Sequence, residues 1–329
     1  MHRPSRPLAL NHIDMDFIDA SPTGQENESE TNSQTALPDM ELIENIGGIL
    51  EQEHLISVDR PPYPASKRYP MNGTHRGKVL IYNNKTYDDD EKYPDREGTE
   101  KDEERLIDSL QRLGFRREDI RVFNDKTVSE IEREAKKLEA DQDLEHSDCL
   151  MVVILTHGEE GDFLMASDHR YHLYEFIEHF TPTKLKSMAG KPKIFIVQAC
   201  RGSKNDRGVL LRARGLQNKY AKDNADSTSS TYTFQKSADM LVIMSSHHGH
   251  FSFRNQATGS WLIQEFCNVI DRCDLETCTI YDILTETNDA VSKRISDVTD
   301  AKYDKKKQIS SFYSTLTKQL YFKPKPNVA

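Results

Sequence analysis

Residues 194–203 read IFIVQACRGS, and this stretch decides the fold and the chemistry expected of the chain. The apolar run 194–197 is typical of a strand buried inside a sheet. The run ends at QACRG, so that Cys200 follows it instead of lying within it. A structural cysteine would be expected inside the run. The position of Cys200 therefore suggests a thiol that is presented at the edge of a sheet.

Strand and helix patterns alternate on both sides of this stretch. Further strands are expected at 77–84, 119–125, 149–158 and 240–246, with a closing strand at 318–322. Helical spacing occurs at 98–115, 127–142, 260–273 and 279–296. Strands that alternate with helices predict βαβ units, and hence an α/β fold whose mostly parallel central sheet has helices on both faces.

The composition argues against several classes of protein. The longest clean apolar run, 151–155, is too short to cross a bilayer, so we expect no membrane association. No basic stripe is interleaved with aromatic residues, so we expect no nucleic-acid partner. The 5 cysteines are odd in number and scattered, which favours a reducing compartment and a cytoplasmic location.

We expect no metal or other cofactor. The spacing of Cys267, Cys273 and Cys278 contains no C-x-x-C pair, so a zinc site is not indicated. The segment SSHHGH, 245–250, is rich in histidine. A metal site there is the alternative to a solvated loop, and we favour the loop.

The composition and the secondary-structure pattern of the sequence change at three points. Residues 1–72 are polar and acidic and contain several prolines, which predicts a mostly disordered arm. Strand and helix patterns occupy 73–202 and resume in 237–329. The intervening 203–236 has neither pattern, and a connection of this length is usually functional or disordered.

Two strands each deliver a reactive residue just past their carboxyl ends. His157 follows one strand and Cys200 follows another. Ligands of open α/β sheets bind at this edge, so the two side chains can meet there. A neighbouring imidazole lowers the pKa of a thiol, and the thiolate is the nucleophile. A lone strand-end cysteine is usually structural and a lone His-Gly is usually a turn, but the combination favours catalysis.

These motifs resemble those of the caspase family, and the likeness covers 76–322. The matching stretches are RGKVLIYNN (76–84), REGTEKDEERL (96–106), THGEEG (156–161), QACRG (198–202), FSFRN (251–255), GSW (259–261) and LTKQLYF (316–322). The resemblance implies a caspase-like three-layer fold and a cysteine endopeptidase that cuts after aspartate. It also implies a zymogen, activated by cleavage, that acts in programmed cell death. The large subunit would be 73–202 and the small subunit 237–329, with a cleavable linker at 203–236 and a propeptide at 1–72.

The resemblance assigns the catalytic roles. Cys200 would be the nucleophile and His157 the base, while the backbone N–H groups of Gly158 and Cys200 would stabilise an oxyanion. The carbonyl of Pro94 matches the group that orients the histidine. Asp95, beside it, is a rival for this role.

The resemblance also assigns the residues that select aspartate. Arg96, Gln198 and Arg254 match positions that bind the substrate aspartate. Two guanidinium groups can hold one carboxylate by paired hydrogen bonds while an amide fixes its orientation. The backbone of Ser252 and Arg254 would pair with the substrate strand. Each arginine alone would otherwise be read as a surface loop residue.

The neighbouring substrate pockets would be lined by residues of two further motifs. Phe251, Phe253 and Asn255 come from FSFRN, and Trp261 comes from GSW. Phe253 occupies a position where many family members have tryptophan, which leaves the preference beyond aspartate open. A simple core role is the alternative for Trp261.

Three aspartates are candidate cleavage sites. Asp226 ends the tetrapeptide DNAD before Ser227 in the linker, and Asp206 is a second candidate there. Asp19 ends DFID before Ala20 in the arm and has the same form. The alternative is that aspartate is simply common in polar linkers.

The arm is short for an adaptor-recruiting domain, which favours an effector-like enzyme over an initiator. The implied partners are protein substrates, a second copy of the large and small subunits, an upstream activating caspase and inhibitor-of-apoptosis proteins. A catalytically silent homologue that acts as a binding partner or decoy is the alternative. A metacaspase or paracaspase would need an acidic pocket, and a nucleotide-binding flavodoxin-like domain would need a glycine-rich phosphate loop; we find neither.

Overall fold

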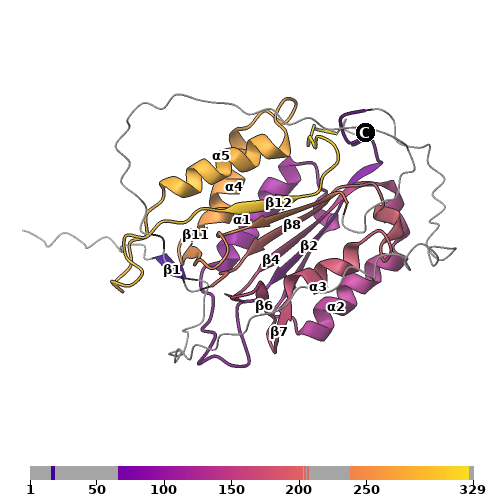
Figure 1. The fold of residues 1–329 in the computed structure, drawn as a ribbon. Coiled ribbons are helices and arrows are strands. Elements are labelled where there is room, and N and C mark those ends of the chain that lie inside the picture. Colours follow the sequence, from indigo (N-terminus) through magenta and orange to yellow (C-terminus); the bar gives the residue numbers. More distant parts are fainter. Residues whose placement is uncertain (1–15, 19–65, 203, 205, 207–237, 326–329) are drawn as a thin grey trace, which may run out of the picture.

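The structure is a computed structural model that describes residues 16–18, 66–202, 204, 206 and 238–325. The described residues form a central sheet with helices on both of its faces (Figure 1). The predicted α/β class, with a mostly parallel sheet in the middle of three layers, is confirmed.

The central sheet has six strands in the order β12-β9-β8-β4-β2-β3. Their bounds are β2 His75–Asn83, β3 Ile120–Asn124, β4 Ser147–Leu155, β8 Lys193–Gln198, β9 Met240–Met244 and β12 Ser311–Ser314. All neighbouring pairs are parallel except β12 and β9, which are antiparallel. The strand predicted from IFIVQ is therefore β8, near the middle of the sheet.

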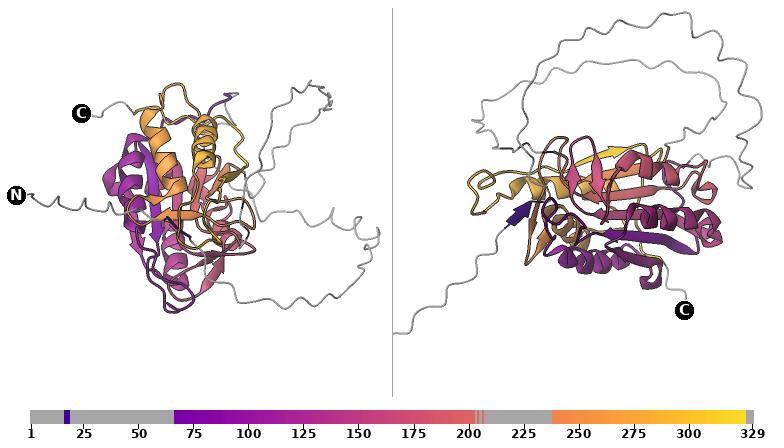
Figure 2. Two further views of the ribbon diagram at one scale, coloured as in Figure 1. Left: turned by 90° about the vertical axis from the view of Figure 1, so that its left-hand side faces the viewer. Right: turned by 90° about the horizontal axis from the view of Figure 1, so that it is seen from below.

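Five α-helices flank the sheet in the described residues. Their bounds are α1 Thr99–Arg112, α2 Val128–Lys137, α3 Leu173–Ile177, α4 Trp261–Arg272 and α5 Ile280–Lys293. Helices α1, α4 and α5 cover one face, and α2 and α3 cover the other (Figures 1 and 2). The helices predicted from apolar spacing agree with α1, α2, α4 and α5 to within a few residues at their ends.

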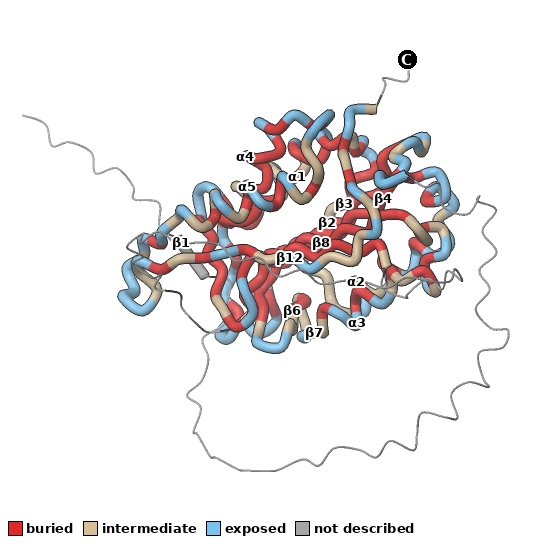
Figure 3. The backbone as a smooth tube through the Cα atoms, turned by 45° about the horizontal axis from the view of Figure 1, so that its top comes forward, coloured by how far each residue is buried: buried red, intermediate tan, exposed pale blue. Residues whose placement is uncertain are grey.

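Burial on both faces explains why the strands have nearly continuous apolar sequences. In β2, Val79 and Ile81 belong to the core cluster beneath α1, α4 and α5, whereas Leu80 and Tyr82 belong to the cluster beneath α2 and α3. Alternate side chains of a strand point to opposite faces, so a strand covered twice needs apolar residues at every position. Figure 3 shows the inner strands of the sheet as buried, whereas the edge strands β3 and β12 include exposed residues.

The closing strand predicted at 318–322 is wrong. This segment makes only isolated bridges, which pair Gln319 with Arg68 and Tyr321 with Thr279. Its apolar side chains, Leu320 and Phe322, instead pack into the core beneath the helices. The sheet ends with β12, whose sequence SFYS has too few apolar residues to have been recognised as a strand.

Two small three-stranded sheets adjoin the ends of the central one. The first contains β5 Gly158–Glu159, β6 Phe163–Met165 and β7 Arg170–His172. The second contains β1 Asp16–Ile18, β10 Phe253–Asn255 and β11 Gly259–Ser260. Most of the predicted arm (1–72) and of the predicted linker (203–236) lies outside the described residues.

Candidate active site

Cys200 and His157 lie at the same edge of the central sheet. Strands β4 and β8 are adjacent and parallel, and their register pairs Leu155 with Gln198. Each reactive residue is two positions beyond its paired strand residue, so both follow the sheet at equivalent places. Because the register of a central parallel pair fixes its ends, the sheet itself positions the imidazole and the thiol.

Gly158 is required by the close approach of these two strand ends. A β-carbon at this position would lie 2.0 Å from the carbonyl oxygen of Cys200 and 3.0 Å from the β-carbon of Ala199. Only glycine therefore fits between the histidine and the segment that carries the thiol.

His157 is held as a neutral base. Its Nε2 donates a hydrogen bond to the carbonyl oxygen of Pro94 at 2.7 Å, because a carbonyl can only accept. Nδ1 is then the unprotonated nitrogen, and it is buried without a hydrogen-bond partner among the described residues. Burial, and secondly the positive charge of Arg96, lower the pKa of His157 to about 3. The free lone pair of Nδ1 can accept a proton.

Cys200 is held as a neutral thiol. Its Sγ lies 3.2 Å from the backbone nitrogen of Ser252, whose N–H points to the sulfur, and 3.6 Å from the Ser252 hydroxyl. Burial raises the pKa of the thiol to about 12, although the Ser252 contacts and the Arg96 charge act in the opposite direction. The nucleophile therefore contacts a backbone group that the sequence predicts to pair with substrate.

Two guanidinium groups are buried in this region, and that of Arg96 interacts electrostatically with the thiol. Arg96, just before α1, donates from Nη1 to the carbonyl of Asn84 and to the hydroxyl of Thr99. Arg254, in β10, donates from Nε to the carbonyl of Glu97 at 2.9 Å, which brings it to the residue after Arg96. Burial lowers the pKa of Arg96, and it lowers the pKa of Arg254 to about 9. An arginine guanidinium keeps its proton at neutral pH in proteins, so both groups are cations.

Gln198 completes this cluster from the last position of β8. Its side-chain Nε2 donates to the hydroxyl of Ser252 at 3.2 Å. Gln198 and both arginines are almost completely buried. The three residues that the sequence predicts to bind aspartate thus come from three separate segments and are linked to one another or to Cys200 through Glu97 and Ser252.

The aromatic residues predicted for the neighbouring pockets are also buried here. The Phe253 ring stacks on Trp261 with ring centroids 4.9 Å apart, and Phe251 meets Tyr303 edge-on at 5.0 Å. The side-chain oxygen of Asn255 accepts from the two N–H groups of the following turn, Ala257 and Thr258. The side chain of Asn255 thereby shapes the β10–β11 turn, and a direct contact with substrate stays a prediction.

Sequence reasoning missed Asp102, a buried carboxylate that joins α1 to the segment carrying Trp261. Asp102 accepts hydrogen bonds from the backbone N–H and hydroxyl of Ser260 and from Gln264. Burial raises the pKa of this carboxyl to about 6. A signal was present, since Asp102 lies four positions before Leu106 and therefore on the buried stripe of the helix.

Gln308 was missed as well, and no pattern in its neighbourhood points to it. Its side chain accepts from the backbone N–H of Phe253 and donates to the carbonyl of Ser245. It therefore links β10 to the end of β9.

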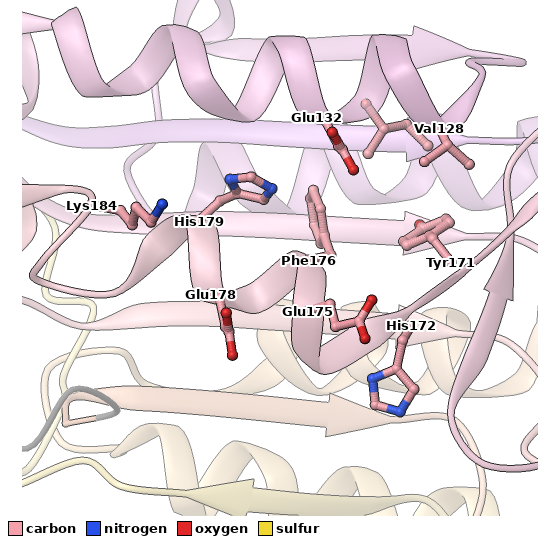
Figure 4. Close-up of a pocket in the computed structure, with 10 residues that line it drawn as sticks. Val128, Glu132, Tyr171, His172, Glu175, Phe176, Glu178, His179 and Lys184 are labelled. Carbon is pink, nitrogen blue, oxygen red and sulfur yellow. The ribbon is translucent and has the colours of Figure 1, made fainter.

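A separate pocket lies between α2 and α3, on the face of the sheet that these two helices cover (Figure 4). It has a volume of about 210 Å³ and is lined by Val128, Ile131, Glu132, Tyr171, His172, Glu175, Phe176, Glu178, His179 and Lys184. It contains no cysteine and none of the residues described above. Across the described ranges, no group of three or more His, Cys, Asp or Glu side chains is placed to hold a metal ion, which gives no support to a metal site at His247, His248 and His250.

The predicted cleavage sites are mostly outside the structure. Asp226 and Asp19 lie outside the described residues. Asp206 is described, and its carbonyl accepts from the backbone N–H of Lys307 at 2.9 Å. None of the helices in the described part of the chain has the length and apolar character to span a membrane.

A strand-end cysteine beside a buried neutral histidine defines a candidate cysteine hydrolase on an α/β sheet. The family model described as "Caspase domain" matches residues 76–321. Caspase-6 of Gallus gallus is 34% identical over 279 residues, which cover 81% of this chain and 86% of that protein. The crystal structure of caspase-1 from Spodoptera frugiperda has a TM-score of 0.71 and 30% identity, and covers 82% of this chain and 98% of that chain. The chain belongs to the caspase family, which is a family of cysteine proteases.

Proposed function

We propose that this chain is an active cysteine endopeptidase that cuts protein substrates after aspartate. The observation that carries the proposal is the burial of Arg96, Arg254 and Gln198 near Cys200: Arg96 interacts with the thiol, Gln198 bonds to Ser252, which contacts the thiol, and Arg254 bonds to the residue after Arg96. Two buried cations favour an anionic side chain, and the amide adds an oriented donor. A lysine side chain would be repelled there and an uncharged one would leave both cations without an ionic partner from the substrate.

The chemistry follows from the two neutral groups. Sγ of Cys200 attacks the backbone carbonyl carbon of the substrate aspartate while its proton passes to Nδ1 of His157. The N–H groups of Gly158 and Cys200 stabilise the oxyanion of the tetrahedral intermediate. His157 then gives the proton to the leaving amine, which leaves a thioester. Water, deprotonated by His157, hydrolyses the thioester and releases the carboxylic acid and the thiol.

The imidazole needs no carboxylate to hold it in this scheme. Pro94 supports the orientation of His157, because its carbonyl keeps the proton on Nε2 and leaves Nδ1 as the base. The side chain of Asp95 is the rival, and exchange of Asp95 for asparagine with full retention of activity would favour Pro94.

The processed enzyme is a dimer of large and small subunit pairs in this proposal. Strand β12 is the outer strand of the central sheet, and two of its side chains, Phe312 and Tyr313, are 37% and 57% exposed. An edge strand with exposed aromatic residues is suited to pair with the same strand of a second copy.

We further propose that the chain is made as a zymogen in the cytoplasm and acts in programmed cell death. Cleavage after Asp226 or Asp206 would separate 73–202 from 237–329, and cleavage after Asp19 would trim the arm. An upstream caspase would begin the processing, and inhibitor-of-apoptosis proteins would be candidate inhibitors. Mass spectrometry of the incubated protein should find fragments that end at these aspartates.

The test of the activity is the turnover of a fluorogenic Asp-x-x-Asp peptide by the processed protein. The matched control is the same peptide with asparagine before the reporter group, which keeps the shape and removes the charge. We expect turnover of the first peptide only. Absence of turnover in the processed dimer would contradict the proposal and favour a silent homologue that acts as a binding partner.

A further inference from the structure

One edge of β10 is paired with β1, a strand from the N-terminal part of the chain. Strand β10 pairs with β11 through one edge and with β1 through the other. The antiparallel register pairs Asp16 with Asn255, Phe17 with Arg254 and Ile18 with Phe253. A segment that precedes the catalytic fold therefore lies on the edge to which we assign the substrate strand.

Strand β1 runs along β10 in the direction that would lead a bound substrate strand toward Cys200. Each step forward along β1 is one step back along β10, from Asn255 toward Ser252. The residue that precedes Phe253 at the start of β10 is Ser252, whose N–H lies against the Cys200 sulfur at 3.2 Å. Position 19 is an aspartate, and Ala20 follows it. Strand β1 therefore runs toward the nucleophile, and the residue that follows β1 in the sequence is an aspartate.

The chemistry of the segment also matches the site. The tetrapeptide DFID has two carboxylates and no cation, whereas the site contains the buried guanidinium groups of Arg96 and Arg254. A guanidinium group binds a carboxylate by paired, charge-assisted hydrogen bonds. The linker tetrapeptide DNAD, which ends at Asp226, repeats the form of an aspartate, two residues, an aspartate and then a small residue.

We propose that Asp16–Ile18 is a tethered substrate strand, which occupies the substrate edge of β10 in the uncut chain and excludes other substrates. The inference deepens the proposed function and rests on it for the cleavage step. A strand on the same chain binds intramolecularly, at an effective concentration on the order of millimolar. Three residues form a short ladder, so the strand can leave once the chain is cut.

The arm is then the first peptide that the site cuts. Cys200 forms a thioester with the carbonyl of Asp19, and the amine of Ala20 leaves with the proton that His157 received. Water hydrolyses the thioester. The preferred substrate class is accordingly an extended peptide with aspartate at its first and fourth positions and apolar residues between them.

The first experiment measures the occupation of β10 without any catalysis. Amide hydrogen exchange of Arg254, the partner of Phe17, is followed in the full chain carrying Cys200→Ala, with and without the pair Phe17→Pro and Ile18→Pro; the N–H of Phe253 is bonded to Gln308 and serves as an internal reference. Two adjacent prolines remove the N–H groups on both sides of the strand, whichever of them is bonded. We expect exchange at Arg254 to become about tenfold faster in the proline variant.

The matched control places the same two prolines elsewhere in the arm, as Thr31→Pro and Asn32→Pro. This control should leave exchange at β10 unchanged. Equal exchange in all three proteins would overturn the inference, and a failure of peptide turnover would not, because the measurement uses no activity. Slow exchange at β10 in an inactive protein would support the strand and contradict the proposed function alone.

The second experiment tests the substrate class with the processed enzyme. The peptide DMDFIDASPTG, residues 14–24, should be cut after Asp19 and should compete with the fluorogenic peptide. The same peptide with proline at positions 17 and 18 should compete at least about tenfold more weakly, since it cannot form the ladder. An enzyme that cuts the fluorogenic peptide but leaves both arm peptides intact would contradict the inference and leave the proposed function standing.

Discussion

The proposed catalytic pair and the proposed aspartate pocket are linked through Ser252, yet they are positioned in different ways. Cys200 and His157 follow two adjacent strands of the central sheet, and the register of that sheet alone places them. The pocket is assembled from short strands and loops that hydrogen bonds between distant residues hold together, such as that from Arg254 to Glu97. The first region depends on the core, and the second depends on individual polar contacts.

The two regions also differ in charge. Burial keeps the Cys200 thiol and the His157 imidazole neutral, whereas Arg96 and Arg254 remain cations at neutral pH despite their burial. A neutral thiol and a neutral imidazole do not react before a substrate binds. Buried cations, in contrast, strongly favour the binding of an anionic side chain. Selection by charge and activation by proton transfer are therefore separable, and substitutions can test each one.

The largest effect is expected at the catalytic pair. Cys200→Ala removes the only group that can form the thioester, so kcat should fall by at least about 10⁴-fold. Cys278→Ala is the control, because this cysteine is only partly buried and lies in the connection between α4 and α5. Steady-state kinetics with the Asp peptide measures both variants. Substantial activity in Cys200→Ala would refute the assignment of the nucleophile.

A smaller effect is expected in the pocket. Arg254→Lys keeps the charge but loses the planar fork and the bond to the carbonyl of Glu97, so kcat/KM for the Asp peptide should fall by about 10²-fold. Arg272→Lys is the control, since Arg272 forms only a partly exposed ion pair with Glu286 in the described structure. If the Arg254→Lys variant had the same kcat/KM as the protein without the substitution, selection of aspartate would not depend on the planar guanidinium group of Arg254.

The difference between the region set by the sheet and the region set by polar contacts also explains which residues could be predicted from the sequence. The positions of Cys200 and His157 followed from apolar runs that end in a reactive residue, because local patterns determine strand ends. Arg96 and Arg254 were recognised only through the resemblance to a family, since nothing in their own neighbourhoods distinguishes them from surface arginines. Asp102 lay on a recognisable buried stripe and was still overlooked.

Long-range contacts account for the rest. The strand β12 was missed because its register with β9, and not its own composition, makes it a strand. Gln308 contributes through contacts with two segments more than fifty residues away in the sequence. The strand β1 in the arm was likewise not expected, because three residues form no pattern until β10 supplies a partner.

Asp102 offers a test of the polar contacts that hold the pocket. Its pKa is about 6 in the folded chain, above the usual value of about 3.9 for an unfolded aspartate. The folded state therefore binds more protons between these values, and the free energy of unfolding should decrease as the pH rises from about 4 to about 6, by roughly 2 kcal/mol from this group.

Asp102→Asn should remove this dependence, because the amide keeps the shape and does not titrate. Urea unfolding at pH 4.5 and pH 7.5 would measure it, and Asp108→Asn, an exposed position on the same helix, is the control. An unchanged pH dependence in Asp102→Asn would mean that the carboxyl is ionised throughout and that the contacts with Ser260 compensate its burial.

The smallest effect is expected at the turn that follows β10. Asn255→Ala removes the acceptor of the Ala257 and Thr258 N–H groups, which should lower the free energy of unfolding by about 1 kcal/mol. The catalytic pair is placed by the central sheet, so kcat should be unchanged while KM rises slightly. Gln256→Ala, exposed in the same turn, is the control. A loss of kcat in Asn255→Ala would show that the β10 region also positions the nucleophile, through the contact between Ser252 and Cys200, and that the two regions are not independent.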